Sequence, residues 1–103
     1  MMNEKRTHKR VSPDQSILIK EDNGNLINYY TLGNISLGGM YLLKKISTKA
    51  GSKSDYTILT PDLKDVKIKG AVVGTRFDNG VYGTAIVFEE LVEDKISGFV
   101  ASF

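Results

Sequence analysis

Two short segments hold residues whose types and spacing suit them to binding a small anion. The first, Arg6-Thr7-His8-Lys9-Arg10, is an R-x-x-x-R pattern and contains two of the three arginines in the chain. An arginine side chain is a planar fork that can bind a phosphate or a guanine edge through two parallel hydrogen bonds, and it also stacks on flat rings. The alternative interpretation of this segment is a solvated basic terminus.

The second segment, Asn34-Ile35-Ser36-Leu37-Gly38-Gly39, fits the pattern [D/N]-x-S-x-x-G. Asn34 and Ser36 carry short polar groups that can bind a guanine edge or a phosphate, and their alternation predicts that both lie on one strand face. The alternative is a turn in which these side chains satisfy their own backbone. Gly39 would let a ligand approach the backbone closely, and Gly38 is a weaker candidate of the same kind; a bulge or a positive φ angle is the other explanation for both.

The positive charge is concentrated near the N-terminus. The 103-residue chain has a net charge of +2, but residues 1–10 hold four basic side chains and one acid, whereas residues 11–103 hold ten basic side chains and eleven acids. A protein that binds long duplex DNA spreads basic residues over a face, because its affinity depends on the number of phosphates neutralised. The pattern therefore favours a compact anion over a nucleic-acid polymer.

The composition excludes several classes of site and predicts one soluble domain. The chain has no cysteine and a single histidine, His8, which excludes thiolate metal sites, disulfides and cysteine nucleophiles and predicts no metal site and no cofactor. The acidic pairs Glu89-Glu90 and Glu93-Asp94 are typical of a solvated helix start, so we do not expect an enzyme. The apolar stretch Ile17–Ile19 is too short for a signal peptide or a membrane span, and we expect a cytoplasmic protein.

Alternating apolar residues and turn signals predict six strands. The expected ranges are Gln15–Glu21, Leu26–Leu32, Met40–Leu43, Tyr56–Thr60, 66–77 and Val81–Phe88, with a polar loop over Lys44–Ser54. Ile96, Phe99, Val100 and Phe103 then follow helical spacing and predict a C-terminal helix over about 91–103 whose apolar stripe packs on the sheet. The expected fold class is therefore all-β, a small antiparallel barrel or sandwich with one terminal helix.

The two motifs, in this order and two strands apart, resemble the PilZ domain family, whose members bind the bacterial second messenger cyclic diguanylate (c-di-GMP). The resemblance covers nearly the whole chain and includes a closing strand, Tyr82–Phe88. It implies a six-stranded antiparallel barrel of the split-barrel type with a C-terminal helix. It also implies a flexible ligand-binding tail over residues 1–11 and a single domain over 12–103.

The resemblance assigns roles to individual residues. It implies that Arg6 and Arg10 are the principal c-di-GMP ligands, with Asn34, Ser36 and Gly39 completing the site. Weaker candidates are Gly38, Lys5 and Arg76. A basic residue at Lys5 favours an intercalated nucleotide pair, and the alternative is a solvated lysine. At Arg76 some relatives stack a residue on guanine, and the alternative is a surface cation beside Asp78. In the last strand Ala85 stands where the family often has glycine, which leaves the register of that strand open.

The function that follows is a c-di-GMP receptor that signals to an unidentified downstream protein when its tail orders on the ligand. A nucleotide-independent adaptor with the same fold is the first alternative, although such proteins usually lack both motifs. A small barrel that binds single-stranded nucleic acid through Tyr29, Tyr30 and Tyr41 is the second, and the nearly neutral body disfavours it. The sequence is compatible with a monomer or a homodimer.

Overall fold

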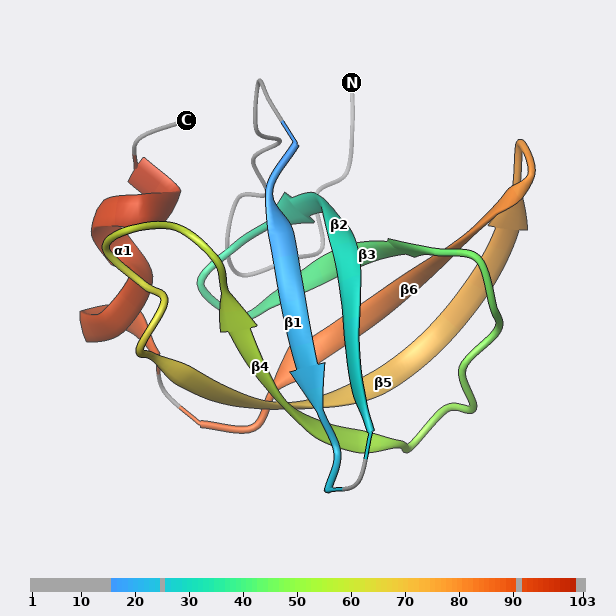
Figure 1. Cartoon of the computed structure of the whole chain (residues 1–103), viewed down its shortest axis with the longest axis horizontal. Coiled ribbons are helices and arrows are strands. Elements are labelled where there is room, and N and C mark those ends of the chain that lie inside the picture. The colour runs from blue at the N-terminus through green and yellow to red at the C-terminus, as the bar shows by residue number, and fades with distance from the viewer. Residues whose placement is uncertain (1–15, 25, 91, 102–103) are drawn as a thin grey trace, which may run out of the picture.

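The computed structural model describes residues 16–24, 26–90 and 92–101, which form six β-strands and one α-helix (Figure 1). The strands are β1 (Leu18–Asp22), β2 (Ile27–Ile35), β3 (Gly39–Lys44), β4 (Lys53–Ile58), β5 (Lys67–Asp78) and β6 (Val81–Phe88), and the helix is α1 (Glu93–Ala101). Each of the six expected strands is present, and the order of elements is the one that the sequence predicts.

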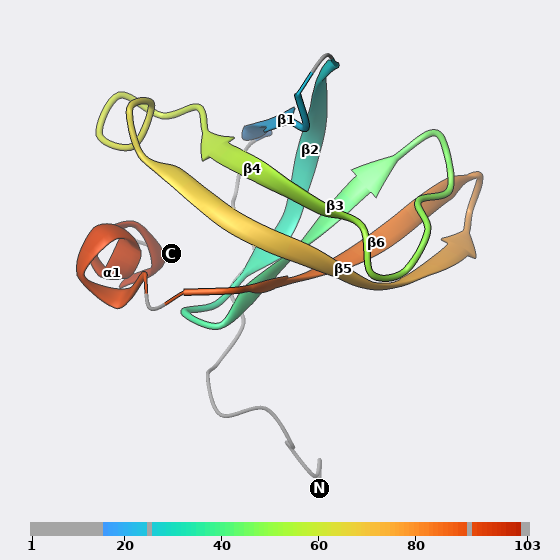
Figure 2. The same cartoon turned by 90° about the horizontal axis from the view of Figure 1, so that it is seen from below.

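The strands close into a barrel in the order β1-β2-β3-β6-β5-β4, and every neighbouring pair is antiparallel. Four of the pairings join consecutive strands, while β3–β6 and β1–β4 join strands distant in sequence and complete the closure. Viewed from below, α1 lies at one side of the barrel and the β5–β6 hairpin extends toward the opposite side (Figure 2). The structure confirms a six-stranded antiparallel barrel with a short C-terminal helix.

The hairpin turns form where the sequence predicts them. Asn79 and Gly80, between β5 and β6, both have positive φ angles (51° and 82°), as a two-residue turn that matches strand twist requires. Gly24, between β1 and β2, has a φ of 101°, and its N–H donates to the Asp22 carboxylate at 3.2 Å. These turns fix the register of the pairs that they join.

One half of the interior is apolar and is covered by the helix. Ile19, Leu42, Ile58 and Ile68 are fully buried there, and α1 adds Ile96, which is also fully buried. Phe99 and Val100 pack against the same cluster, which confirms that the helical stripe packs on the barrel; Phe103 lies outside the described residues. Burying one such isoleucine contributes about 2 kcal/mol. No helix among the described residues has the length and apolar character of a membrane span.

The other half of the interior is polar and is organised around a buried carboxylate. Glu21 is 5% exposed and accepts three hydroxyl hydrogen bonds, from Tyr30 (2.9 Å), Ser54 (2.9 Å) and Tyr56 (3.3 Å). Burial, and then the neighbouring Glu21, raises the pKa of both tyrosines well above the ordinary value of 10.0. Both carboxylate oxygens of Glu21 thus have hydrogen-bond partners although almost no water reaches them.

A buried lysine lies in the same polar half. Lys44 is 2% exposed; its ammonium donates to Thr48 Oγ1 at 2.9 Å and lies 4.4 Å from the centre of the Tyr30 ring. Burial lowers the pKa of Lys44, and the opposite charge of Glu21 partly offsets that effect. Tyr30 therefore links the two buried charges, through its hydroxyl to Glu21 and through its ring to Lys44.

The strand boundaries differ from prediction where strands face this polar interior. Lys44 ends β3 rather than starting a loop, and β4 begins at Lys53 rather than Tyr56 because Ser54 points inward to Glu21. Polar residues at inward positions remove the alternation on which the prediction depends. β2 also continues past Leu32 to Ile35, because a bulge near Gly33 lets pairing with β3 resume after a shift in register.

Candidate ligand-binding site

The corner between β2 and β3 is held by its own hydrogen bonds. The Ser36 N–H donates to the Gly39 carbonyl at 2.8 Å, and the Ser36 hydroxyl donates to the same carbonyl at 3.4 Å while accepting the Gly38 N–H at 3.2 Å. The Gly38 carbonyl accepts the N–H of Phe88 on β6 at 3.0 Å. Ser36 is buried, and its hydroxyl holds the corner in one conformation.

Gly39 is where the corner packs most closely against its neighbour. A Cβ atom at this position would overlap the backbone carbonyl oxygen of Ile86 on β6. Gly39 does not adopt a positive φ angle, so glycine is required here for steric rather than conformational reasons. The glycine is therefore explained by β3–β6 packing, with no ligand needed to account for it.

Asn34 differs from its neighbours because its side chain has an unsatisfied acceptor. It lies near the end of β2 and pairs with Tyr41 on β3. Its Oδ1 atom is buried and has no hydrogen-bond partner. Leaving such an atom unpaired costs about 1–3 kcal/mol, so a group of this kind in a folded chain calls for an explanation.

A pocket of about 440 Å³ opens beside Asn34 on the outer face of the barrel. Its lining comes from β2, β3, β5 and β6 and consists of Asn34, Tyr41, Gly74, Thr75, Arg76, Gly83 and Ala85. The volume lies within the range of ligand pockets. Three of these residues are glycine or alanine, so the floor of the pocket is formed largely by strand backbone without large side chains.

Tyr41 forms an aromatic surface at this pocket. A Cβ atom at Gly83 would overlap the hydroxyl end of the Tyr41 ring, so the ring lies directly against the β6 backbone at Gly83. At Gly74, by contrast, a Cβ atom would meet nothing within 4 Å. The absence of a side chain at Gly83 thus lets Tyr41 lie across the sheet, where the free face of its ring can contact a flat ligand.

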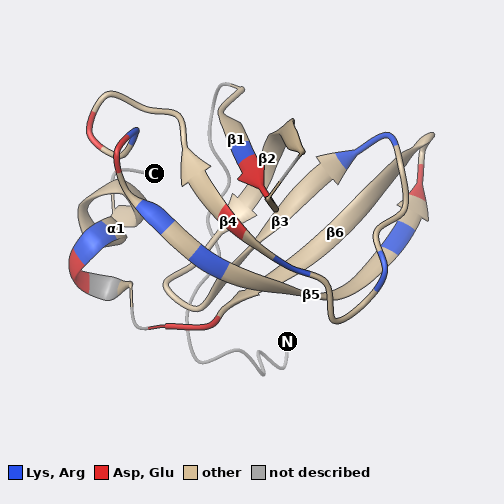
Figure 3. Cartoon of the chain, turned by 60° about the horizontal axis from the view of Figure 1, so that its bottom comes forward, with Lys and Arg blue, Asp and Glu red and all other residues tan. Residues whose placement is uncertain are grey.

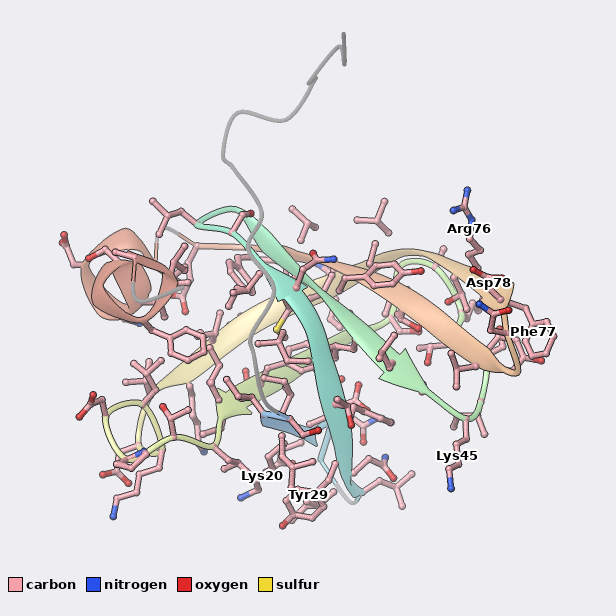
Figure 4. The ribbon with its side chains drawn as sticks, turned by 90° about the horizontal axis from the view of Figure 1, so that it is seen from above. Lys20, Tyr29, Lys45, Arg76, Phe77 and Asp78 are labelled. Carbon is pink, nitrogen blue, oxygen red and sulfur yellow. The ribbon has the colours of Figure 1, made fainter. Side chains whose placement is uncertain are left out.

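Arg76 supplies the cationic group of the pocket. It pairs with Gly83, it is exposed, and no ion pair within the described residues involves it. Its side chain points away from the barrel, on the side opposite to Lys20, Tyr29 and Lys45 (Figure 4). Its guanidinium is therefore available at the rim of the pocket that Asn34 lines.

The structure brings two of the predicted site residues together, Asn34 and Arg76, at one pocket. Ser36, Gly38 and Gly39 form the adjoining corner, and Arg6, Arg10 and Lys5 lie outside the described residues. The prediction did not include Tyr41 in this site. The signal available for it was its register: Tyr41 is the second residue after the glycine pair and therefore pairs with Asn34 across the corner.

Charges on the described strands are interspersed in sign, without a continuous basic face (Figure 3). Tyr29 is exposed, whereas the Tyr30 hydroxyl points inward to Glu21 and Tyr41 lies against Gly83. The three tyrosines therefore do not form the row of exposed rings that a single-strand binder uses.

Comparison with known proteins identifies the family. The family model described as the PilZ domain matches residues 4–101. The chain belongs to the PilZ domain family. No curated protein sequence matches this PilZ domain at a significant level.

Solved structures share its fold at low sequence identity. The PilZ domain with c-di-GMP of YcgR from Escherichia coli aligns with a TM-score of 0.77 at 14% identity, over 96% of this chain and 91% of that one. The Bacillus subtilis inhibitor of motility MotI/DgrA aligns with a TM-score of 0.77 at 13% identity, over 97% of this chain and 50% of that one. The K. pneumonia MrkH–c-di-GMP complex aligns with a TM-score of 0.78 at 14% identity, over 97% of this chain and 52% of that one. This PilZ domain therefore spans about half the length of the MotI/DgrA and MrkH chains.

Proposed function

We propose that this PilZ domain is a receptor for c-di-GMP rather than an enzyme. The observation that carries the proposal is the buried, unpartnered Oδ1 of Asn34 at the edge of a pocket that Tyr41 and Arg76 also line. Family membership and the c-di-GMP complexes named for the YcgR and MrkH structures support the choice of ligand.

The chemistry of guanine matches this pocket. Guanine carries N–H donors on its Watson–Crick edge, and one of them would satisfy the Asn34 oxygen once the amide group rotates to face the pocket. The Tyr41 ring offers a stacking surface, and the Arg76 fork offers donors to a phosphate or to the guanine O6/N7 edge. An adenine ring presents an acceptor where guanine has its N1–H donor, so the pocket would discriminate against it.

The remaining ligands in this proposal come from the N-terminal segment. Arg6 and Arg10 are its principal ligands, with Lys5 beside them favouring an intercalated nucleotide pair. Four fully extended residues span about 13 Å, so the two arginines can contact opposite sides of a compact dinucleotide. Residues 1–11 then act as the ligand-binding segment and 12–103 as the barrel domain.

The corner contributes mainly by holding Asn34 in position. The buried Ser36 hydroxyl makes two hydrogen bonds within the corner and so fixes the backbone that carries Asn34. Gly39 allows close packing of the corner against β6, and the Gly38 carbonyl bonds to the Phe88 N–H on the same strand. Ordering of residues 1–11 over the ligand would create a new surface, and an unidentified downstream protein would recognise it.

The test is calorimetric titration of c-di-GMP into the full chain and into two variants. We expect saturable binding to the wild type, at least a hundredfold loss in Arg10→Ala, and about a tenfold loss in Asn34→Ala. Lys9→Ala is the matched control, because it removes the same charge from the adjacent position without removing a fork; it should change affinity less than threefold.

Two nucleotide controls sharpen the titration. GTP should not compete, and cyclic di-AMP should bind at least tenfold more weakly than c-di-GMP if Asn34 reads guanine. Circular dichroism must show that Arg10→Ala, Asn34→Ala and Lys9→Ala are all folded. Absence of c-di-GMP binding to a folded wild type would overturn the proposal and would favour the nucleotide-independent adaptor.

A further inference from the structure

β2 extends beyond the end of its partner on one side. The last pair between β2 and β3 is Thr31 with Leu43, whereas pairing of β2 with β1 continues as far as Ile27 with Asp22. Among the described residues, none pairs with 27–30 on the side that faces β3. β2 and β3 separate at this point in Figure 1. The barrel therefore has an open strand edge over residues 27–30.

Hydrogen-bond alternation shows which backbone groups face this open edge. The Leu32 N–H donates to the Ile17 carbonyl at 2.8 Å, and the Asn23 N–H donates to the Leu26 carbonyl at 3.2 Å. Both bonds are in phase with the β1–β2 register, so every second residue of β2 bonds to β1. The residues between them, Ile27 and Tyr29, direct their N–H and C=O groups away from β1, toward the open edge.

The side chains at this edge form a pocket of about 370 Å³. Its lining includes the apolar residues Leu18, Tyr29, Leu43 and Ile46. Tyr29 and Ile46 are 58% and 61% exposed. Tyr29 projects from the barrel together with Lys20, on the same side as Lys45 (Figure 4). Protein edges are usually protected by charge, proline or a bulge, so exposed apolar residues at an unpaired edge are typical of a binding surface.

The charge of this pocket is positive. Its lining includes Lys44 and Lys45 and no acid. Within the described residues, the Lys44 ammonium has one hydrogen-bond acceptor, Thr48 Oγ1, and can donate two further bonds. The nearby Glu21 carboxylate is already engaged by three hydroxyls, and Asp22 lies opposite Ile27 at the far end of the edge.

We propose that the open edge of β2 binds an extended segment of a partner protein as an additional strand, with acidic residues alternating with apolar ones. Backbone groups of Ile27 and Tyr29 would pair with the segment, as in other strand-addition complexes. Its apolar side chains pack beside Tyr29 and Leu43 on the outer face. Its acidic side chains, which alternate to the other face, meet Lys44, and those near the rim meet Lys45.

Charge argues against two other candidates for binding at this edge, residues 1–15 of the same chain and a second copy of the chain. Residues 1–15 of this chain hold four basic side chains and two acids, so they are repelled by the lysines rather than attracted. A second copy would bring an equally basic edge, with its own Lys44 and Lys45, against this one. The proposed surface is separate from the nucleotide pocket and does not depend on the proposed function.

The test uses two capped synthetic peptides, one alternating glutamate with valine and one alternating lysine with valine, titrated into the isotopically labelled full chain. We expect the glutamate peptide to bind saturably, to protect the amides of Ile27 and Tyr29 from hydrogen exchange, and to shift the resonances of Leu43 and Lys45. The lysine peptide should bind at least tenfold more weakly.

Two variants separate backbone pairing from charge. Tyr29→Pro removes the outward N–H and should abolish binding. The variant should still fold, because proline is tolerated where a strand N–H faces solvent. Lys45→Glu is a surface change that leaves the fold intact and should weaken binding about tenfold, whereas Lys49→Glu, an exposed lysine outside the pocket lining, is its matched control and should have little effect.

Three results would overturn the proposal. The first is no saturable binding of the glutamate peptide to the wild type. The second is equal binding of both peptides, or equal effects of Lys45→Glu and Lys49→Glu. The third is protection of the Ile27 and Tyr29 amides before any peptide is added: sedimentation would then assign the occupant, a dimer indicating a second copy and a monomer indicating residues 1–15.

Discussion

The two ends of the β2–β3 pair are built in opposite ways. At the Asn34 end the corner satisfies its own backbone, Gly39 packs against β6 with no space for a Cβ atom, and the interior is apolar. At the other end, past Thr31 and Leu43, the strands separate and the interior holds Glu21 and Lys44.

The difference indicates that each end depends on a different physical term. Close packing of backbone on backbone fixes the corner, which suits a pocket that must present one acceptor in one position. Charge and hydroxyl hydrogen bonds hold the open end, where β3 turns away and leaves backbone groups of Ile27 and Tyr29 unpaired. Changes in charge should therefore affect one end and changes in volume the other.

The largest effect is expected from breaking the charge network of the open end. Glu21→Gln should lower the free energy of unfolding by about 3 kcal/mol, because Lys44 then remains buried without an opposite charge and one hydroxyl loses its acceptor. Urea unfolding at neutral pH measures the loss. Glu21→Gln combined with Lys44→Met should recover part of it, because the double variant buries no net charge. A loss below about 0.5 kcal/mol would show that the charges are not coupled to folding.

A smaller effect is expected from adding one methyl group at the corner. Gly39→Ala should cost about 2 kcal/mol, because its Cβ atom would overlap the Ile86 carbonyl and neither backbone can move freely. Gly74→Ala is the matched control, since its Cβ atom would meet nothing within 4 Å, and it should change stability by less than about 0.5 kcal/mol. Equal effects in urea unfolding would contradict the steric account of the corner.

The apolar half of the molecule was predictable from sequence, because period and burial coincide there. Ile17 and Ile19 alternate with the exposed Leu18, and Ile96 lies on a helical stripe, so the pattern alone indicates which side chains face the interior. Asn79-Gly80 likewise identifies its own turn. These features are local, because each depends on residues that are close together in the sequence.

The polar half and part of the site were not predictable in this way, because they depend on long-range pairing. Glu21 is satisfied by Ser54 and Tyr56, more than thirty residues away, so nothing near it in sequence indicates burial. Lys44 resembled the start of a loop for the same reason. Tyr41 lines the pocket only because Gly83, on the neighbouring strand β6, leaves room for its ring.

The smallest effect is expected from alkaline pH, which acts on the buried titratable groups of the open end. Burial and Glu21 raise the pKa of Tyr30 and Tyr56 in the folded chain above 10.0, so their contribution to stability is complete below pH 10 and is lost as the pH rises toward the folded-state values. Lys44 has the opposite sign: its pKa is lowered below 10.5, so its contribution rises with pH and is complete by about pH 10.5.

The net stability should therefore fall above about pH 10, and most steeply above about pH 10.5, where the two tyrosines act without the opposing change at Lys44. Urea unfolding across this range, with the ultraviolet absorbance of tyrosinate, measures both the fall and the proton release. Tyr56→Phe should reduce the slope by removing one of the two phenols, and Glu21→Gln should reduce it by removing a carboxylate that raises both pKa values. A slope that neither variant changes would place the alkaline transition outside the polar interior, and the contrast between the two ends of β2–β3 would lose its electrostatic basis.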